Sequence, residues 1–399
     1  MLWRRIKHSF YIGLMKTFAG LGPGACHRLF AGSGSSRALC HHIARTGVRK
    51  VLVVTDKPLR DLGVADSAVT GLVEAGVDIA WYDGVMPDPT FDQVKAGAAV
   101  MREHGCEAVL TVGGGSSIDA GKIIAAAAAS PDAPEDWVGH NRIKHEHPPI
   151  YAIPTTSGTG SEATMGAVIS DSNSHEKSIV AGGSLLPAAA ALDADLILGL
   201  PPQITAATGM DALTHAVEAY IGVWERGTRR QDARMSVKLI FDHLADACRD
   251  GSNLAAREGM AMGAWYGGLA INQVNVGNVH AIAHQLGGKY GIPHGLANAL
   301  VLPHVLEFCR EEAAPQLAEL AVLVGAGSAG DDQGALASAF IQAVRDLRVQ
   351  VGIADRSDLI RREDHAALCE AAMAEGDGYP APRLLDRDST LAILAEITV

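Results

Sequence analysis

Cysteine is scarce in this sequence, and no two cysteines lie close together. The chain has 6 cysteines among 399 residues, and it lacks the closely spaced pairs that are typical of thiolate metal sites. Their scatter argues against a disulfide framework and favours a reducing compartment. We therefore expect a cytoplasmic protein whose cysteines are small, buried apolar residues.

Basic runs and long apolar runs are also lacking. Lysine and arginine together number 33 against 45 acidic residues, giving a formal net charge of −12, and this balance argues against a nucleic-acid partner. No stretch reaches the ~20 apolar residues that span a bilayer. Near the start, Lys16 interrupts a short apolar run at Phe10–Met15. We therefore expect residues 1–30 to form an N-terminal arm rather than a signal peptide. A weak contact with a membrane surface through Trp3, Arg4, Arg5 and Lys7 is the less favoured alternative.

From about Lys50 the sequence alternates between apolar, β-branched runs and helix-like segments. Strands separated by helices of this length imply a parallel sheet with helices on its faces. The expected strands are 51–56, 77–84, 108–112 and 150–153, and the expected helices are 64–75 and 91–104.

Beyond about Leu200 the pattern becomes helical, and two successive prolines, Pro201 and Pro202, mark the change. Segments rich in Ala, Leu and Met follow at 231–246, 254–270 and 314–324. We predict an α/β domain over residues 31–200 and an all-helical domain over residues 201–399.

A glycine-rich segment, GGGSSIDAGK at Gly113–Lys122, follows one of the strands and opens a helix. Glycines let the backbone come close to a ligand, Ser116 and Ser117 can cap the helix, and the exposed N–H groups suit an anion such as a pyrophosphate. The spacing is neither GxGxxG nor a Walker A loop, so a purely structural turn is an equal alternative.

A second loop, within IPTTSGTGSEAT at Ile153–Thr164, follows another expected strand. Its hydroxyl groups would line the same crevice at the strand ends, where open parallel sheets bind ligands. Asp56 ends the first strand, where an acidic side chain can bind a ribose 2′-hydroxyl and so favour NAD over NADP. A helix N-cap is the alternative role for Asp56.

Potential metal ligands gather in two later segments. Asp211 and His215 are four residues apart among good helix formers, so both project from one helical face. His280 and His284 repeat this spacing on a second helix, which we expect to end at the glycines 287–288. His294 follows in a turn-like context that returns another imidazole to the same place.

A single histidine on an apolar helix is more often a core residue than a ligand. Five potential ligands in two segments are better explained by a divalent cation, which would neutralise a buried aspartate beside several imidazoles. Carboxylate and imidazole ligands suit iron(II) or zinc(II), and the affinity order does not choose between them.

Together these motifs resemble the iron-containing (group III) alcohol dehydrogenases, a family that includes lactaldehyde reductase. The similarity extends from about Ser33 to the C-terminus and rests on TDK, GGGSSIDAGK, IPTTSGTGSE, ATGMDALTHAVEAY and HAIAHQLGGKYGIPHGLANA, in that order. The resemblance implies a Rossmann-like α/β dinucleotide-binding domain with a parallel sheet, followed by an all-α metal and substrate domain.

Carried over to this chain, the resemblance assigns roles to individual residues. The implied metal ligands are Asp211, His215, His280 and His294. His284 matches a further active-site histidine and is our candidate catalytic residue. The implied cofactor-binding residues are Asp56, Gly113, Gly114, Gly115, Ser116, Ser117, Thr155, Thr156, Thr159 and Lys177.

The function implied by the resemblance is hydride transfer between a primary alcohol or its aldehyde and NAD(H), assisted by iron(II) or zinc(II). A homodimer acting on a small alcohol or aldehyde is expected. The alternative is a zinc-dependent polyol dehydrogenase of the glycerol type. A dehydroquinate-synthase-like lyase fits less well, because no cluster of Lys or Arg flanks the metal motifs.

One departure from the family pattern bears on specificity. GDGYPAPRLLD, at Gly376–Asp386, stands where many members have a shorter stretch that closes in Asn-Pro-Arg. Tyr379 in this segment would either face the substrate pocket or belong to a rigid proline turn at the surface.

Overall fold

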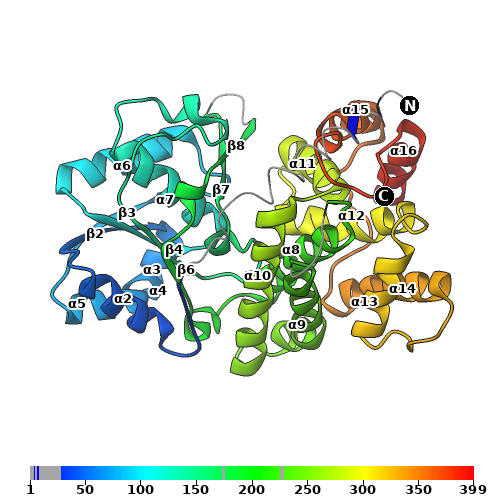
Figure 1. The fold of residues 1–399 in the computed structure, drawn as a ribbon, viewed down its shortest axis with the longest axis horizontal. Coiled ribbons are helices and arrows are strands. Elements are labelled where there is room, and N and C mark those ends of the chain that lie inside the picture. The colour runs from blue at the N-terminus through cyan, green and yellow to red at the C-terminus, as the bar shows by residue number, and fades with distance from the viewer. Residues whose placement is uncertain (1–3, 5–6, 9–27, 173–175, 225–228) are drawn as a thin grey trace. The chain divides into compact units, whose positions relative to one another are not determined.

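The computed structural model describes residues 4, 7–8, 28–172, 176–224 and 229–399 (Figure 1). The described residues form two compact units. The first, which we call the α/β unit, comprises residues 28–200 and 252–261. The second, the helical unit, comprises residues 201–251 and 262–399 with the described residues at the N-terminus. The predicted arm over residues 1–30 lies largely outside the described residues.

A six-stranded sheet forms the centre of the α/β unit. Its strand order is β1-β9-β6-β4-β2-β3, and neighbouring strands pair in parallel. The parallel sheet expected from the sequence is therefore confirmed. The strands are β1 (Arg28–Ala31), β2 (Lys50–Asp56), β3 (Asp78–Val85), β4 (Ala108–Gly113), β6 (Ile150–Pro154) and β9 (Ala189–Leu192).

Helices cover both faces of this sheet, as Figure 1 shows. Leu52 and Val54 on β2 belong to a core cluster with α6 and α7, whereas Val51 and Val53 belong to a cluster with α2 and α5. Both faces are apolar because successive side chains of a strand point to opposite sides. The helices are α2 (Ser35–Arg45), α3 (Lys57–Asp61), α4 (Val64–Ala68), α5 (Thr70–Glu74), α6 (Phe91–His104) and α7 (Gly115–Ala128).

A smaller sheet of three strands, in the order β5-β8-β7, completes the α/β unit. Strands β7 (Gly166–Ser170) and β8 (Lys177–Ala181) are antiparallel, and β5 (Gly139–His140) pairs with β8 in parallel. Short 3₁₀ turns lie at 134–137, 161–163, 183–185 and 194–197.

The single helix expected over residues 64–75 is wrong, because the chain breaks at Val69 between α4 and α5. Val69 has φ −101° and ψ 7°, outside the helical region. The break brings Gly71 against α2, where an added Cβ would lie 2.7 Å from the carbonyl oxygen of Arg37. Close packing of α5 on α2 thus takes precedence over a continuous helix.

The helical unit contains α8 (Pro202–Ile221) as its first complete helix. Its first residue is a proline, a residue type that is favoured at the first position of a helix. The first residues of α10, 254–261, belong to the α/β unit. No helix among the described residues is both long and apolar enough to cross a membrane. The other helices are α9 (Arg229–Arg249), α10 (Leu254–Val274), α11 (Asn278–Tyr290), α12 (His294–Phe308), α13 (Ala314–Leu323), α14 (Gln333–Gln350), α15 (His365–Gly376) and α16 (Arg387–Glu396).

Two details around the second metal segment differ from expectation. Helix α11 does not end at the glycines 287–288 but continues to Tyr290, because Gly291 provides the left-handed cap with φ 65°. His294 is not in a turn but is the first residue of α12. The histidine is therefore fixed by a helix terminus rather than by a loop.

Candidate functional site

Four predicted ligands come together in the helical unit. Asp211 and His215 lie one turn apart on α8, His280 lies on α11 and His294 begins α12. One ligand atom from each residue lies within 4.8 Å of every other. Oδ1 of Asp211 is 3.4 Å from Nε2 of His294, 3.9 Å from Nε2 of His215 and 4.0 Å from Nε2 of His280.

This arrangement fits a divalent cation. Ligand atoms bonded to one ion at about 2.1 Å lie roughly 3–4 Å from one another, close to the separations observed around Asp211. Asp211 and His280 are both 2% exposed, and an isolated carboxylate at such a depth would be costly. Burial holds the pKa of His280 well below its usual value, so the imidazole is neutral, as a metal ligand must be.

Glu218 supports the cluster and was missed by the sequence analysis. Nδ1 of His280 donates to Oε2 of Glu218 at 2.6 Å, which leaves Nε2 as the unprotonated atom that faces Asp211. The same carboxylate accepts the backbone N–H groups of Gly277 at 2.8 Å and Val279 at 2.6 Å. Its position three residues after His215, on the same face of α8, is the sequence signal that could have found it.

Asn298 is a second residue that the sequence analysis did not identify. Its Nδ2 donates to Oδ1 of Asp211 at 2.6 Å and lies 3.2 Å from Nε2 of both His280 and His294. Asn298 stands one turn after His294 on α12, so its amide orients the carboxylate from the same helix that supplies a histidine.

Burial of Glu218 raises its pKa to about 8, and the hydrogen bonds from Gly277, Val279 and His280 oppose that rise.

The close approach of α12 to α8 depends on Gly295. A Cβ at this position would lie 2.2 Å from the carbonyl oxygen of Ala207. A glycine directly after His294 is therefore needed to bring that histidine to Asp211.

His284 lies beside this cluster without belonging to it. Its ring centroid is 5.6 Å from that of His280 and 5.3 Å from that of His294. Its Nδ1 donates to Oε1 of Glu375 at 2.5 Å. The hydroxyl of Tyr379 donates to the same oxygen at 2.6 Å. Tyr379 is 7% exposed, so it is a buried partner of Glu375 rather than part of a surface turn.

The glycine loop (Gly113–Ser117) and the threonine loop (Thr155–Gly160) lie side by side in the α/β unit. Gly113 on β4 is in register with Pro154 on β6. An added Cβ on Gly115 would lie 2.6 Å from Cγ2 of Thr159. The absence of a side chain at Gly115 is therefore what lets the two loops touch.

The helix that follows the glycine loop has no side-chain cap. Gly114 is the N-cap residue of α7, and no side chain bonds to the first turn. The expected capping role of Ser116 and Ser117 is wrong, because both lie inside the first turn. An uncapped helix N-terminus with glycines before it suits an anionic ligand such as a pyrophosphate.

Two other predicted cofactor residues, Asp56 and Lys177, have protein partners. Asp56 caps α3, since its Oδ1 accepts the N–H of Leu59 at 2.8 Å, and burial raises its pKa. It also ends β2, the neighbour of β4, so it lies at the same edge of the sheet as the glycine loop. Lys177 on β8 forms an ion pair with Asp88 at 2.6 Å.

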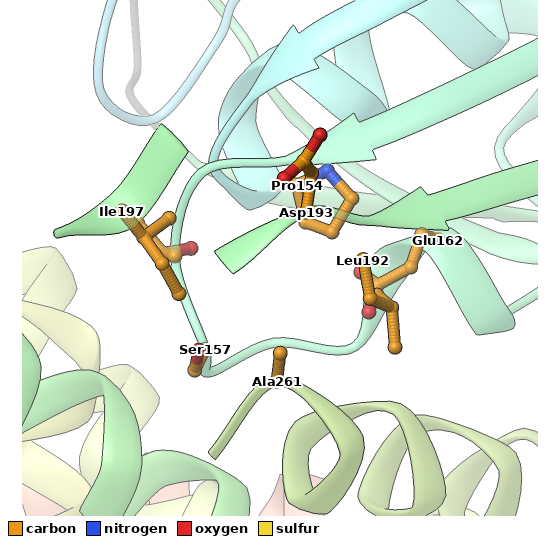
Figure 2. A pocket seen from close by; sticks show the side chains of 8 residues that line it. Pro154, Ser157, Glu162, Leu192, Asp193, Ile197 and Ala261 are labelled. Carbon is orange, nitrogen blue, oxygen red and sulfur yellow. The ribbon is translucent and has the colours of Figure 1, made fainter. Parts of the chain in front are cut away.

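A small pocket lies beside the threonine loop within the α/β unit (Figure 2). It opens at the carboxyl ends of β6 and β9, and two of the residues that line it are acidic. Asp193 accepts hydrogen bonds from the N–H of Ser36 at 3.0 Å and from its hydroxyl at 2.5 Å. The lining residues are Pro154, Thr156, Ser157, Glu162, Leu192, Asp193, Ile197 and Ala261.

A doubly covered parallel sheet with an uncapped helix N-terminus, together with a cluster of carboxylate and imidazole ligands, is typical of a metal-dependent enzyme that uses a nucleotide. The family comparison specifies the class. Residues 26–194 match the family model described as iron-containing alcohol dehydrogenase, and residues 205–398 match the C-terminal model of the same family. The chain belongs to the iron-containing alcohol dehydrogenase family and is an oxidoreductase.

Curated relatives agree with this assignment. The 1,3-propanediol dehydrogenase of Citrobacter freundii is 39% identical over 341 residues, covering 84% of this chain and 88% of the relative. The lactaldehyde reductase of Escherichia coli is 36% identical and covers 92% and 95%. The NAD-dependent methanol dehydrogenase of Bacillus methanolicus is 36% identical and covers 81% and 84%. The resemblance seen in the sequence is thus confirmed.

A solved structure supports the fold. The crystal structure of a 1,3-propanediol oxidoreductase superposes with a TM-score of 0.90 at 37% identity, covering 93% of this chain and 97% of the other. The predicted fold class, an α/β part with a parallel sheet followed by a helical part, is confirmed. Iron and NAD as the expected cofactors agree with the family and with the ligand cluster.

Proposed function

We propose that this protein interconverts a primary alcohol and its aldehyde, with NAD(H) as the hydride carrier and iron(II) held by Asp211, His215, His280 and His294. The observation that carries the proposal is the buried four-residue cluster, whose ligand atoms lie within 4.8 Å of one another. When bound, iron(II) acts as a Lewis acid on the alcohol or carbonyl oxygen, and NAD accepts the hydride.

The residues around the cluster prepare it for that chemistry. Asp211 supplies the negative charge, and the neutral imidazoles complete a ligand set typical of iron(II) or zinc(II). Glu218 fixes the tautomer of His280, and Asn298 fixes the direction of the Asp211 carboxylate. These contacts hold the ligand atoms in place before the ion binds, which raises its affinity.

His284 is the proposed catalytic residue. Glu375 accepts the proton on Nδ1 of His284, so Nε2 is the atom that can take up the proton of the alcohol and release it again. The side chain of His284 is 25% exposed, which gives that proton a route to solvent.

The cofactor loops of the α/β unit form the proposed NAD site. The N–H groups at the start of α7 would bind the pyrophosphate, and the hydroxyls of Thr155, Thr156 and Thr159 would line the neighbouring wall. We propose that Asp56 binds a ribose hydroxyl with the oxygen that does not cap α3, and that Lys177 contacts the other ribose.

Two finer proposals concern assembly and location. We propose a homodimer, as expected from the sequence, which analytical ultracentrifugation would test. We also propose a cytoplasmic location. The support for it is that no disulfide links the cysteines in the described part of the chain.

Anaerobic reconstitution tests the function. Metal-stripped protein would be supplied with iron(II), zinc(II) or no metal, and NADH absorbance would be followed with primary alcohols, diols and glycerol. We expect iron(II) to restore oxidation of a primary alcohol. Restoration by zinc(II) alone, with glycerol as the best substrate, would contradict the proposal and favour the polyol dehydrogenase. Inactivity with every metal and substrate would refute the dehydrogenase assignment.

A further inference from the structure

A lysine is completely buried beside the cofactor loops. Lys122 lies on α7, the helix that begins at the glycine loop, and is 0% exposed. Its Nζ lies within hydrogen-bond distance of the carbonyl oxygens of Ser161 (2.8 Å) and Gly166 (2.6 Å). It also reaches the hydroxyls of Ser161 (2.9 Å) and Thr164 (3.2 Å). All these acceptors lie in residues 161–166, directly after the threonine loop.

Asp119, one turn earlier on α7, binds the same segment through both carboxylate oxygens. Oδ1 accepts the hydroxyl of Ser161 at 2.5 Å, and Oδ2 accepts the N–H of Val168 at 2.9 Å. Nζ of Lys122 is 3.9 Å from Oδ1 of Asp119. Helix α7 therefore holds the chain at both ends of residues 161–168.

This arrangement distinguishes Lys122 from the lysines that bind phosphates in nucleotide loops. A phosphate-binding lysine must reach the ligand, whereas Nζ of Lys122 is enclosed and its hydrogen bonds go to protein oxygens. Burial lowers the pKa of Lys122 to about 8. An apolar side chain would fill the same volume without this desolvation cost, so packing alone does not explain a lysine here.

We propose that Lys122 and Asp119 are positioning residues for NAD, which fix the threonine loop against the glycine loop before the cofactor binds. The contact between Gly115 and Thr159 leaves little room for movement of the threonine loop, because an added Cβ on Gly115 would lie 2.6 Å from Cγ2 and 2.9 Å from Oγ1 of Thr159. Since α7 starts in one loop and holds the end of the other, a single helix sets both walls of the site. This proposal rests on the proposed NAD-binding function.

The expected consequence is a change in cofactor affinity without a change in the metal centre. If Lys122 is replaced by methionine, the threonine loop gains freedom that NAD must remove on binding, so its Kd rises by about tenfold. At saturating NAD the turnover number should change less than the KM for NAD. Iron content should not change, because the ligands lie in the helical unit.

The test is NADH binding, measured by calorimetry on iron-loaded Lys122→Met, together with hydrogen exchange of residues 155–164. The matched control is Ile124→Ala, which truncates another fully buried side chain of α7. A merely structural role predicts that both variants lose stability and keep the wild-type Kd. The proposal predicts a raised Kd and faster exchange in Lys122→Met only.

Ser161→Ala is the second variant, in case Lys122→Met does not fold. It removes the hydroxyl shared by Asp119 and Lys122, and we expect a smaller rise in Kd, by roughly threefold. A wild-type Kd and wild-type exchange in the folded variants would overturn the positioning role alone. Failure of the wild-type protein itself to bind NADH would instead refute the proposed function, and this inference with it.

Discussion

The metal cluster depends on side chains, whereas the cofactor loops depend mainly on backbone groups and on positions without a side chain. The cluster consists of four side chains that project from three helices, and two further side chains, Glu218 and Asn298, fix their directions. The cofactor loops consist mainly of backbone, hydroxyl groups and positions where a side chain is missing, such as Gly115. Removing atoms should therefore damage the cluster, whereas adding atoms should damage the loops.

The largest effect is expected where a cluster side chain is removed. His280→Ala deletes one of the four ligands and leaves Glu218 buried without its imidazole partner. We expect loss of bound iron and a fall in kcat/KM of more than about a hundredfold. Metal analysis and NADH absorbance measure both effects. His243→Ala on α9, outside the cluster, is the control, and equal losses in the two variants would argue against a specific site.

A smaller effect is expected at Glu218, which contacts the proposed ligand His280 and is not itself a proposed ligand. Glu218→Gln keeps the shape of the side chain, but it replaces one of two accepting oxygens by an NH2 group. That group would face either the donor Nδ1 of His280 or the donor N–H of Val279, so one of these hydrogen bonds is lost. Iron affinity should fall by about 10- to 100-fold, measured by competition with a chelator. Circular dichroism would verify that the variant is folded. Wild-type affinity would show that Glu218 does not orient its histidine.

Adding one methyl group to the glycine loop tests the other half of the comparison, that the cofactor loops are damaged by added atoms. Gly115→Ala would place a Cβ 2.6 Å from Cγ2 of Thr159. We expect a loss of about 1–3 kcal/mol in the free energy of unfolding and weaker NAD binding, with iron content unchanged. The control is Gly199→Ala, where an added Cβ meets nothing within 4 Å. An unaltered NAD affinity in Gly115→Ala would contradict the described packing of the loops.

The smallest effect on catalysis is expected at Glu162, which lines the pocket beside the threonine loop. Burial raises its pKa from 4.5 to about 7. Between these values the folded protein holds a proton that the unfolded chain has lost, so the free energy of unfolding falls as pH rises from about 4.5 to 7.

Glu162→Gln removes this dependence. The variant should match the wild type below pH 4.5 and exceed its stability above pH 7, by at most about 3 kcal/mol. Chemical denaturation across this pH range is the measurement, and Glu103→Gln on the surface of α6 is the control. Equal pH profiles for the wild type and Glu162→Gln would show that this carboxyl does not cause the pH dependence of the free energy of unfolding.

Local patterns predicted many of the elements and the side chains that gather around Asp211. The expected helix over residues 91–104 matches α6, whose ends are set by the Thr90 cap and by Gly105 in the left-handed region. The i, i+4 spacing of Asp211 and His215 likewise places both side chains on one face of α8. Such features depend on residues within a few positions of one another.

Features that depend on packing between distant segments could not be read from the sequence. Glu375 lies 91 residues from His284, its hydrogen-bond partner, and no local pattern links them. The caps of α7 and α11 were also misjudged, because several nearby glycines compete for each helix end and tertiary packing selects one. The roles of the individual cofactor residues remain predictions.

X-ray absorption at the iron edge of the reconstituted protein tests the central claim most directly. Iron held by Asp211, His215, His280 and His294 should show only nitrogen and oxygen neighbours at about 2.0–2.2 Å, with the scattering pattern of three imidazoles. The imidazole signal should weaken in His280→Ala. Sulfur neighbours at about 2.3 Å, or an iron spectrum unchanged by His280→Ala, would contradict the account.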